Sequence, residues 1–548
     1  MSESVRTRSL TERASSDTPP VTLVTWAPPG SPWAVATSEA GTLRLGTAQG
    51  RWVLLATVLG SSMAMLDGTV VNVALPRIGA DLGAQLDALQ WTLNAYLLTL
   101  AGLILLGGAL GDRYGRRRVF LLGVVWFAAA SAACAAAPTI EVLILARAVQ
   151  GVGGALLTPG SLAMLQAVFH PDDRSAAVGL WSGFGGVSAA VGPLLGGWLV
   201  DGPGWRWIFL LNLPLAALVV AVSARHVPES RDESATGRFD VLGAVLAALA
   251  LGAVTYALTA AGKGVSAAVW VTGVAGLLLG AAFIAVERRT PEPMLPLGLF
   301  SSRLFTAVNL VTLAVYAAFS GVFFLLVVQL QIVSGFSPLV SGLALVPITV
   351  IMLVLSARAG RLGKRIGPRL PLTVGPVLCA VGVLLMLRIG PGASYWTDVL
   401  PAVAVMGFGM VLLVAPLTAT VLAAVDVRHA GIASGVNNAA ARAAGLLAVA
   451  ALPSLAGLSG DAYRVPDAVD SAFRTAMLIC AGLLVAGGVT ALVAVHGNVL
   501  APEDEHPVAE PDCRYTCPTN GPPLDPGHPA AVPAEHGEGP AASSATGP

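Results

Sequence analysis

The sequence predicts an all-α integral membrane protein with 14 transmembrane helices, and three observations lead to this fold class. The chain of 548 residues is 55% hydrophobic and 11% charged, with a mean hydropathy of +0.76, which is too apolar for a soluble protein of several domains. Its apolar residues form runs of roughly 20, the length that a helix needs to cross about 30 Å of hydrocarbon. The connections between these runs are strongly basic on one side only.

Each span is placed where an apolar run begins and ends. We predict spans at 52–75, 88–110, 118–137, 140–168, 174–200, 206–225, 240–261, 266–286, 304–332, 338–359, 369–388, 397–424, 429–457 and 472–496. Gly262, Lys263 and Gly264 mark the turn between the seventh and eighth spans, because 240–286 is too long for a single span. A count of twelve spans is the alternative if this turn is misread.

The spans divide the chain into five parts. These are a disordered tail over 1–50, a six-helix bundle over 51–226, an inserted helix pair over 239–287, a second six-helix bundle over 303–497 and a disordered tail over 498–548. An even number of spans puts both tails on one side, where the loops carry most of the arginines. Arginines beside spans favour the cytoplasmic side, so we expect both termini in the cytoplasm.

The most basic connection is GGALGDRYGRRRVFLLG at 107–123, and topology alone would explain its arginines. Topology does not explain its aspartate or its glycines. The run resembles the G-x-L-x-D-r-x-G-r-r loop between helices 2 and 3 of the major facilitator superfamily. The matching residues are Gly108, Leu110, Asp112, Arg113, Gly115, Arg116 and Arg117. The resemblance implies a gating role in transport for all of them except Leu110.

A weaker copy of this pattern indicates that the two bundles are related. The run AGRLGKRIGPR at 359–369 aligns with 107–117, so that Gly367 matches Gly115. Repeats of this kind occur in transporters whose halves rock about a site near the membrane midplane. Lys364 stands where the first copy has its aspartate, so the second copy lacks the carboxylate.

Asp67 is an ionisable residue inside the first span, where a charge is costly and therefore suggests a function. Counted from the ends of their spans, Asp67 and Arg147 lie about 13 and 12 Å deep. They can form an ion pair if the first and fourth spans are neighbours, as in the resembled fold. The arginine favours the charged carboxylate and burial favours the protonated one, so this pair is the predicted proton-coupling site. A static pair that joins two helices is the alternative.

Two glycine-rich runs also resemble motifs of this superfamily. The run that begins at Arg147 resembles its helix-4 motif, through Arg147, Gln150, Gly151, Gly153 and Gly154. GPLLGG at 192–197 resembles a helix-5 motif of antiporters rather than symporters, which implies export and a gating role. Close helix packing alone is the alternative explanation for the glycines. The gating residues in this run are Gly192, Pro193, Gly196 and Gly197.

Two further runs resemble signatures of the fourteen-helix drug/proton antiporters. The first is WRWIFLLNLP at 205–214, whose Trp205 and Trp207 we expect to form an aromatic belt at the membrane interface. The second is AGIASGVNNAAARAAG at 430–445, in which the usual glutamine after the arginine is replaced by alanine. Arg442 has no visible acidic partner in its bundle, and we expect water or the mouth of a cavity to solvate it.

A greasy substrate pocket with few polar anchors is expected between the bundles. Tyr316, Phe319 and Phe323 follow i, i+3, i+7 spacing and share one helix face. A packing or lipid-facing role is the alternative for each residue. Because Asp67 is the one membrane acid that we can identify, neutral, weakly basic or anionic cargo is favoured over dications. The other predicted pocket residues are Trp91, Asn94, Gln150, Trp181, Met406 and Met410.

Several motifs are absent from the sequence. It has no G-x-x-x-x-G-K-[ST], HExxH, nucleophile elbow or plausible Cys/His metal cluster, and its basic residues are not interleaved with aromatics. We therefore expect no enzyme activity, no metal or other cofactor, and no nucleotide or nucleic-acid partner. The coupling ion would be the proton. High Ala, Gly and Val, with Arg in excess of Lys, indicate a GC-rich bacterial genome.

Together these features predict a proton-coupled antiporter that exports a hydrophobic drug or antibiotic across the cytoplasmic membrane by alternating access. We expect it to sit in membrane lipid and to function as a monomer. One alternative is a proton-linked importer or facilitator of a metabolite. A second alternative is a membrane sensor that signals through its tails and transports nothing.

Overall fold

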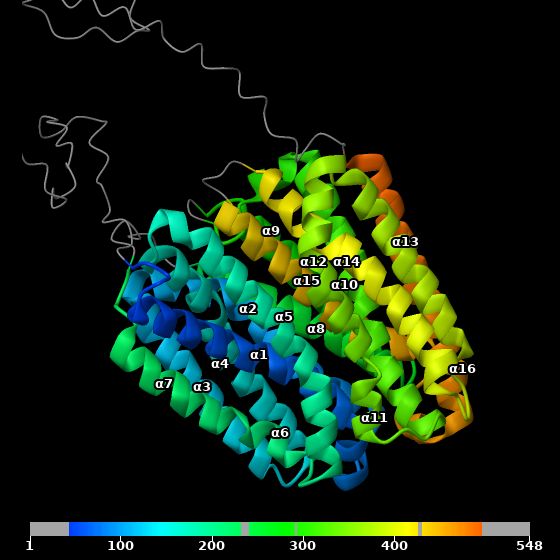
Figure 1. Ribbon diagram of the computed structural model, residues 1–548. Helices are drawn as coiled ribbons and strands as arrows, with labels where there is room; N and C mark the ends of the chain where they lie inside the picture. The colour runs from blue at the N-terminus through cyan, green and yellow to red at the C-terminus, as the bar shows by residue number, and fades with distance from the viewer. Residues whose placement is uncertain (1–42, 232–239, 291–292, 426–429, 496–548) are drawn as a thin grey trace, which may run out of the picture.

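The computed structural model describes residues 43–231, 240–290, 293–425 and 430–495, which form an assembly of helices (Figure 1). Within these ranges the chain has no strand beyond a single bridge between Leu43 and Phe169. The predicted tails lie mostly outside the described residues. Residues 43–50 are the exception, because Arg44 donates a hydrogen bond to Asp172 at 3.0 Å and α1 begins at Ala48 instead of belonging to a tail.

Polar caps and one glycine with a positive φ set the helix boundaries of the first half. Thr47 starts α1 by accepting a hydrogen bond from the Gly50 amide at 3.0 Å. Gly115 has a φ of +108°, which ends α2 and lets α3 begin at the next residue. The helices are α1 (Ala48–Asp81), α2 (Leu86–Tyr114), α3 (Arg116–Ala136), α4 (Ile140–Val168), α5 (Pro171–Asp201), α6 (Arg206–Leu210) and α7 (Asn212–His226).

The inserted pair and the second half follow the same plan. The pair consists of α8 (Val241–Ala261) and α9 (Ala267–Glu287), with the predicted turn between them. The helices of the second half are α10 (Arg303–Val328), α11 (Pro338–Leu343), α12 (Val346–Ile366), α13 (Arg369–Leu385), α14 (Leu400–Ala423), α15 (Ala430–Leu455) and α16 (Pro466–Ala494). Shorter helical turns lie at Leu297–Ser301, Gln329–Val333, Met386–Arg388, Tyr395–Val399 and Gly460–Arg464.

The described part of the chain contains 13 helical segments that are long and apolar enough to cross a membrane, with α6 and α7 counting as one segment and α11 and α12 as another. The helix α5, which we predicted as the fifth span, is not among them, although its 31 residues are long enough. The all-α membrane fold is therefore confirmed. The total of 14 spans stays a prediction.

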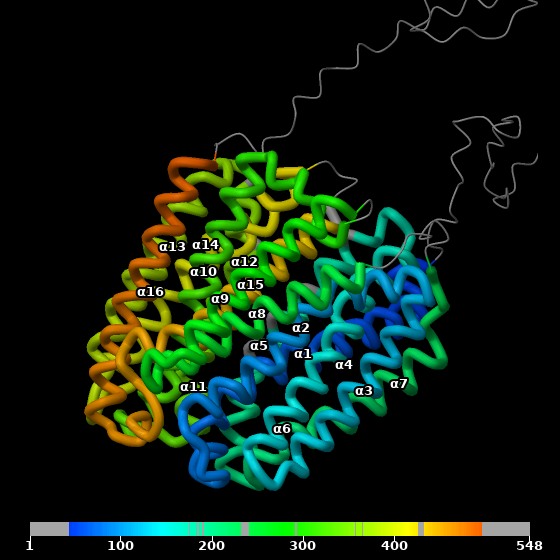
Figure 2. Tube along the Cα trace, turned by 180° about the vertical axis from the view of Figure 1, so that it is seen from behind, coloured from blue at the N-terminus to red at the C-terminus, as the bar shows by residue number. Residues whose placement is uncertain are grey.

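The helices form two halves that stand side by side, α1–α7 in one and α10–α16 in the other (Figures 1 and 2). The first and last described residues lie at one end of this assembly, called here the termini side. The helices α6 and α11 lie at the opposite end, called the far side. The inserted helix α8 packs against both α2 and α15, so it covers the seam between the halves that these two helices form.

The structure is closed on the far side. Among the described residues, the hydrogen bonds that join the two halves lie toward that end of the helices. They run from Gln331 Nε2 to Val73 O (3.0 Å), Leu339 N to Asp201 Oδ2 (3.0 Å), Tyr463 Oη to Ala84 O (2.9 Å), Gln90 Nε2 to Val449 O (2.6 Å), with further bonds from Gln85, Gln90 and Arg464. The hydrogen bond to Tyr463 raises the pKa of Arg464, which keeps this donor charged.

The two basic turns adopt similar backbone geometry, which supports the internal repeat. Gly115 ends α2 with a φ of +108° and Gly367 ends α12 with a φ of +78°. A Cβ on Gly108 would meet Pro159 of α4 at 3.6 Å, and one on Gly363 would meet Pro416 of α14 at 3.1 Å. In both halves a glycine therefore faces a proline of the neighbouring helix, and only at Gly363 would an added Cβ be tightly placed.

Candidate functional site

The two charges predicted inside the membrane form an ion pair. Asp67 comes from the middle of α1, where its Oδ2 accepts a hydrogen bond from Arg147 Nη1 of α4. Both side chains are fully buried. Arg147 also donates from Nε to the backbone carbonyl of Thr92 at 3.1 Å, and its Cζ lies 4.3 Å from the centre of the Tyr96 ring. The arginine is thus held on several sides.

Three buried polar side chains complete a hydrogen-bonded cluster around this pair. Gln150 accepts from Arg147 Nη1 at 2.6 Å and donates to Asp67 Oδ1 at 2.9 Å. Asn212 of α7 donates to the same Oδ1 at 3.3 Å. Ser131 of α3 accepts from both amides, at 2.8 and 3.2 Å. Four helices of the first half therefore contribute to one sealed polar cluster.

In this arrangement, protonation of Asp67 would change the charge balance of the buried cluster. In the ionised state the carboxylate accepts hydrogen bonds from an arginine and two amides, which offsets the cost of burial. Protonation removes the negative charge and leaves Arg147 as an uncompensated buried cation, a change worth several kcal/mol. A site of this kind can convert the uptake of one proton into a rearrangement of α1 and α4. Among the described residues, no group of three or more His, Cys, Asp or Glu side chains could hold a metal ion.

A cavity of about 820 Å³ lies between the two halves. The helix α1 contributes to both sites, because Thr69 and Asn72 line the cavity while Asp67 lies in the sealed cluster. The cavity extends toward the termini side as far as Gly179, Gly360 and Thr418. Its lining is mainly apolar, with a few hydroxyl and amide groups and no acidic residue. This composition suits a hydrophobic ligand with few polar groups.

Four of the predicted pocket residues line this cavity. Tyr316, Phe319 and Phe323 form an aromatic row on α10, in which successive ring centres lie 6.1 and 6.4 Å apart. Met410 of α14 lines the same cavity.

The other five predicted pocket residues lie elsewhere, which corrects that part of the prediction. Trp91 packs on Tyr256 of the inserted helix α8, with ring centres 6.4 Å apart, and Trp181 donates to Ser61 at 2.9 Å inside the first half. Gln150 belongs to the charge cluster. Met406 is fully buried against α13, while Asn94 is fully buried on α2.

The basic loop after α2 binds the segment that follows α7. Arg116 pairs with Asp112 at 2.8 Å, and its backbone amide donates to Ser230 O at 2.8 Å. Arg117 donates to Val227 O at 2.9 Å, and Glu229 lies 4.0 and 3.6 Å from the side chains of Arg117 and Arg118. A Cβ on Gly115 would meet Glu229 at 2.6 Å. The loop therefore ties α2 and α3 to the start of the link with the inserted pair.

The predicted gating run on α5 lies between α1 and the second half. A Cβ on Gly192 would meet Thr69 of α1 at 2.0 Å, and one on Gly196 would meet Val70 O at 3.0 Å. On the other face, a Cβ on Gly197 would meet Pro338 O at 2.5 Å. The contact is reciprocal, because a Cβ on Gly342 of α11 would meet Pro193 O at 2.1 Å. The glycines allow the two halves to touch through their backbones.

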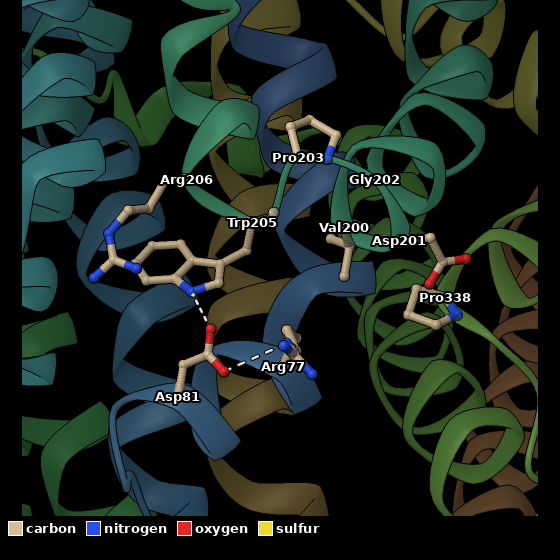
Figure 3. A pocket seen from close by; sticks show the side chains of 10 residues that line it. Arg77, Asp81, Val200, Asp201, Gly202, Pro203, Trp205, Arg206 and Pro338 are labelled. Atoms are coloured by element: carbon tan, nitrogen blue, oxygen red, sulfur yellow. Dashed lines mark hydrogen bonds and ion pairs between the residues drawn. The ribbon is translucent and has the colours of Figure 1, made fainter.

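A polar pocket of about 470 Å³ adjoins this contact on the far side (Figure 3). Asp81 at the end of α1 accepts from Trp205 Nε1 at 3.1 Å and pairs with Arg77 at 3.3 Å. Trp205 is only 1% exposed, so the expectation that it belongs to an interfacial belt is wrong, whereas Trp207 is 51% exposed. Arg206 lies over the Trp205 ring at 4.3 Å. Trp205 therefore anchors the end of α1.

Sequence reasoning missed Asn212 and Tyr96, which contact the ion pair, and Ser131, which accepts hydrogen bonds from the two amides of the cluster. Asn212 had a signal, because it is an amide inside an otherwise apolar run. No sequence signal marked Ser131 or Tyr96, since serine and tyrosine are both ordinary residues in a membrane helix.

Two halves of packed membrane helices, a cavity between them and contacts that close one side are the architecture of a membrane transporter. The sequence profile described as Major Facilitator Superfamily matches residues 57–449, and the chain belongs to this superfamily.

Related proteins carry similar sequences. The chain is 36% identical to the multidrug resistance protein Stp of Mycobacterium tuberculosis, over 70% of this chain and 72% of that protein. It is 37% identical to a probable actinorhodin transporter of Streptomyces coelicolor, over 75% and 74% of the two chains. It is 35% identical to the puromycin resistance protein pur8 of Streptomyces alboniger, over 83% and 93%.

A solved structure supports the fold. The crystal structure of the peptide transporter POT in complex with sulfate superposes with a TM-score of 0.60, covering 83% of this chain and 96% of that one. At 16% sequence identity this similarity concerns the fold alone.

Proposed function

We propose that this protein is a proton-coupled antiporter that exports hydrophobic small molecules, such as drugs or antibiotics, across the cytoplasmic membrane. The names of the relatives support export, since they describe multidrug resistance, puromycin resistance and actinorhodin transport. The mainly apolar cavity supports hydrophobic cargo. Each chain contains both halves and the whole cavity, which supports function as a monomer.

The direction of transport follows from the side on which the cavity is loaded. The basic loops on the termini side favour the cytoplasm, so the far side would face the exterior. Closure of the far side then leaves the cavity positioned to receive cargo from the cytoplasm. Opening of the contact between α5 and α11 would release that cargo outside.

The sealed Asp67–Arg147 pair is the observation that carries the proposal of proton coupling. In this scheme Asp67 takes up a proton when the far side is open and releases it to the cytoplasm after the halves have moved. The Arg147 charge drives the release, because it stabilises the ionised carboxylate. Thr69 and Asn72 on the same helix line the cavity, so a shift of α1 changes the binding site directly.

Transport into inside-out vesicles tests this scheme. A resistance profile of cells with and without the protein identifies a transported antibiotic, beginning with puromycin. Vesicles should accumulate the labelled compound when their lumen is acidic, and Asp67→Asn should abolish this accumulation. Downhill exchange without a gradient should persist in the variant, because the asparagine can still hydrogen-bond with Gln150.

Asp87→Asn is the matched control, since Asp87 pairs with Lys263 at 2.8 Å at the end of α2 and lies outside the cluster. It should keep gradient-driven accumulation. Size-exclusion chromatography of each variant separates loss of coupling from loss of fold. Full accumulation by Asp67→Asn would remove this residue from the mechanism, and wild-type transport that ignores the gradient would rule out antiport.

A further inference from the structure

Arg442 on α15 lies at the same depth as the aromatic row of α10. Five residues toward the termini side, Asn437 donates to Asn309 and Thr312 at 3.2 and 2.7 Å. One turn toward the far side, a Cβ on Gly445 would meet Ser320 at 2.6 Å. This register sets Arg442 level with Tyr316, whose ring lines the cavity.

The contacts of α15 with α2 of the first half place Arg442 at the same depth. Gln90 of α2 donates to the carbonyl of Val449, and a Cβ on Gly435 would meet Leu105 at 3.1 Å. Between these contacts Arg442 lies level with the turn of α2 that contains Tyr96. Tyr96 in turn stacks on Arg147. The two halves therefore each present an arginine at one level.

Only one carboxylate matches these two arginines. Asp67 is committed to Arg147, and Arg442 forms no ion pair among the residues that the structure describes. Its hydrogen bond goes to Asn438 of its own helix, at 3.1 Å, and the side chain is partly exposed. An arginine inside a membrane protein is costly unless a negative group or water compensates it. In the described part of the chain, Arg442 is therefore a positive charge without a matching carboxylate.

A second polar group at the seam between α2 and α15 also lacks a partner. Asn94 of α2 is fully buried, and in the described structure neither its amide nitrogen nor its amide oxygen has a hydrogen-bond partner. Asn94 lies one helical turn beyond the contact of Gln90 with α15, facing the same seam. Buried amides are normally satisfied, so an unpaired one between moving halves points to a partner that the protein alone does not supply.

We propose that Arg442 is the anion-binding group of the cargo site, and that the preferred cargo is an aromatic monoanion bearing a carboxylate or phenolate. Its rings would stack on Tyr316, Phe319 and Phe323, and the negative group would reach Arg442. This inference rests on the proposed function, because it names the class of compound that the same cavity exports.

Three pyrene ligands with the same ring and different head groups test the inference. They are pyrenebutyrate, pyrenebutanol and pyrenebutylamine, which are an anion, a neutral alcohol and a cation at pH 7.5. Binding to the full-length protein in nanodiscs is measured by energy transfer from tryptophan, with empty nanodiscs correcting for partition into lipid. The wild type should bind the anion more tightly than the alcohol, by about tenfold or more, the range of a charge-assisted hydrogen bond.

Arg442→Gln should remove this preference while leaving the affinity for the alcohol unchanged, and Arg442→Lys should retain part of it. Thermal unfolding provides an independent readout. Because Arg442 has no ion-pair partner, Arg442→Gln should be at least as stable as the wild type.

Equal affinity of the wild type for all three ligands, or equal loss of all three in Arg442→Gln, would overturn the anion site and leave the proposed export of neutral compounds intact. Failure of the resistance and vesicle assays for every compound would instead contradict the proposed function.

Discussion

The contact between Gly197 of α5 and the start of α11 should determine how often the far side opens. We predict that Gly197→Ala shifts the protein toward a conformation open on that side. The new methyl group would lie 2.5 Å from Pro338 O and 2.6 Å from Leu339 Cα, whereas ordinary contacts between such atoms lie near 3.5–4 Å. The atoms that the methyl group would meet on α11 all belong to the backbone, so no flexible side chain can rotate to make room. The α11 backbone must retreat by about 1 Å.

The size of the shift follows from the cost of overpacking. Extra methyl groups in a tightly packed core cost about 1–3 kcal/mol. The methyl group clashes only while the halves touch, so this cost falls on the closed state alone. The ratio of open to closed molecules should then rise by about 5-fold to 150-fold.

Spin-label distances across the far side measure this ratio. Trp207 and Trp396 are 51% and 73% exposed, lie near the far ends of the two halves, and can be replaced by labelled cysteines. Gly183→Ala is the matched control on the same helix, because a Cβ there meets no atom within 4 Å. Gly197→Ala should enlarge the population with a longer distance, and the control should not. Identical distance distributions in Gly197→Ala and the wild type would refute the reasoning.

Two other substitutions test neighbouring parts of the structure. Asp201→Asn should weaken the contact of this carboxylate with the Leu339 amide at the N-terminus of α11 by about 0.5–1 kcal/mol. The same label pair should then report a few-fold rise in opening, and an unchanged distribution would contradict the role of Asp201. Gly115→Ala should destabilise the protein by about 1–3 kcal/mol, because the position has a φ of +108° and a Cβ would meet Glu229 at 2.6 Å. Thermal unfolding in detergent measures this loss of stability, with Gly179→Ala as the control, because a Cβ on Gly179 meets no atom within 4 Å. An equal unfolding midpoint for the two variants would contradict the predicted strain at position 115.

The fold class and the ion pair could be predicted because each depends on position along the chain. Span length needs no knowledge of neighbours, and Asp67 and Arg147 are rare charges at matching depths of their helices. Their pairing followed once the resemblance made α1 and α4 neighbours. The aromatic row on α10 was found for a similar reason, since i, i+3, i+7 spacing marks one face of a single helix.

The rest depended on how each helix is rotated, which spacing does not determine. Trp91 and Trp181 were expected in the cavity, but one packs on the inserted pair and the other bonds to Ser61. Trp205 was assigned to the membrane interface, yet Asp81, which is 124 residues earlier in the chain, binds its indole. Ser131 became part of the charge cluster through contacts with α4 and α7 that no local pattern encodes.

The position of α8 makes the protein asymmetric toward the surrounding bilayer. It lies across the α2–α15 seam and contacts both helices, while α9 beside it has few buried residues. The opposite seam, between α5 and α12, has no such cover in the described structure, and both helices line the cavity. The two faces of the protein therefore present different surfaces to lipid, one covered by the extra helix pair and the other formed by the helices that line the cavity.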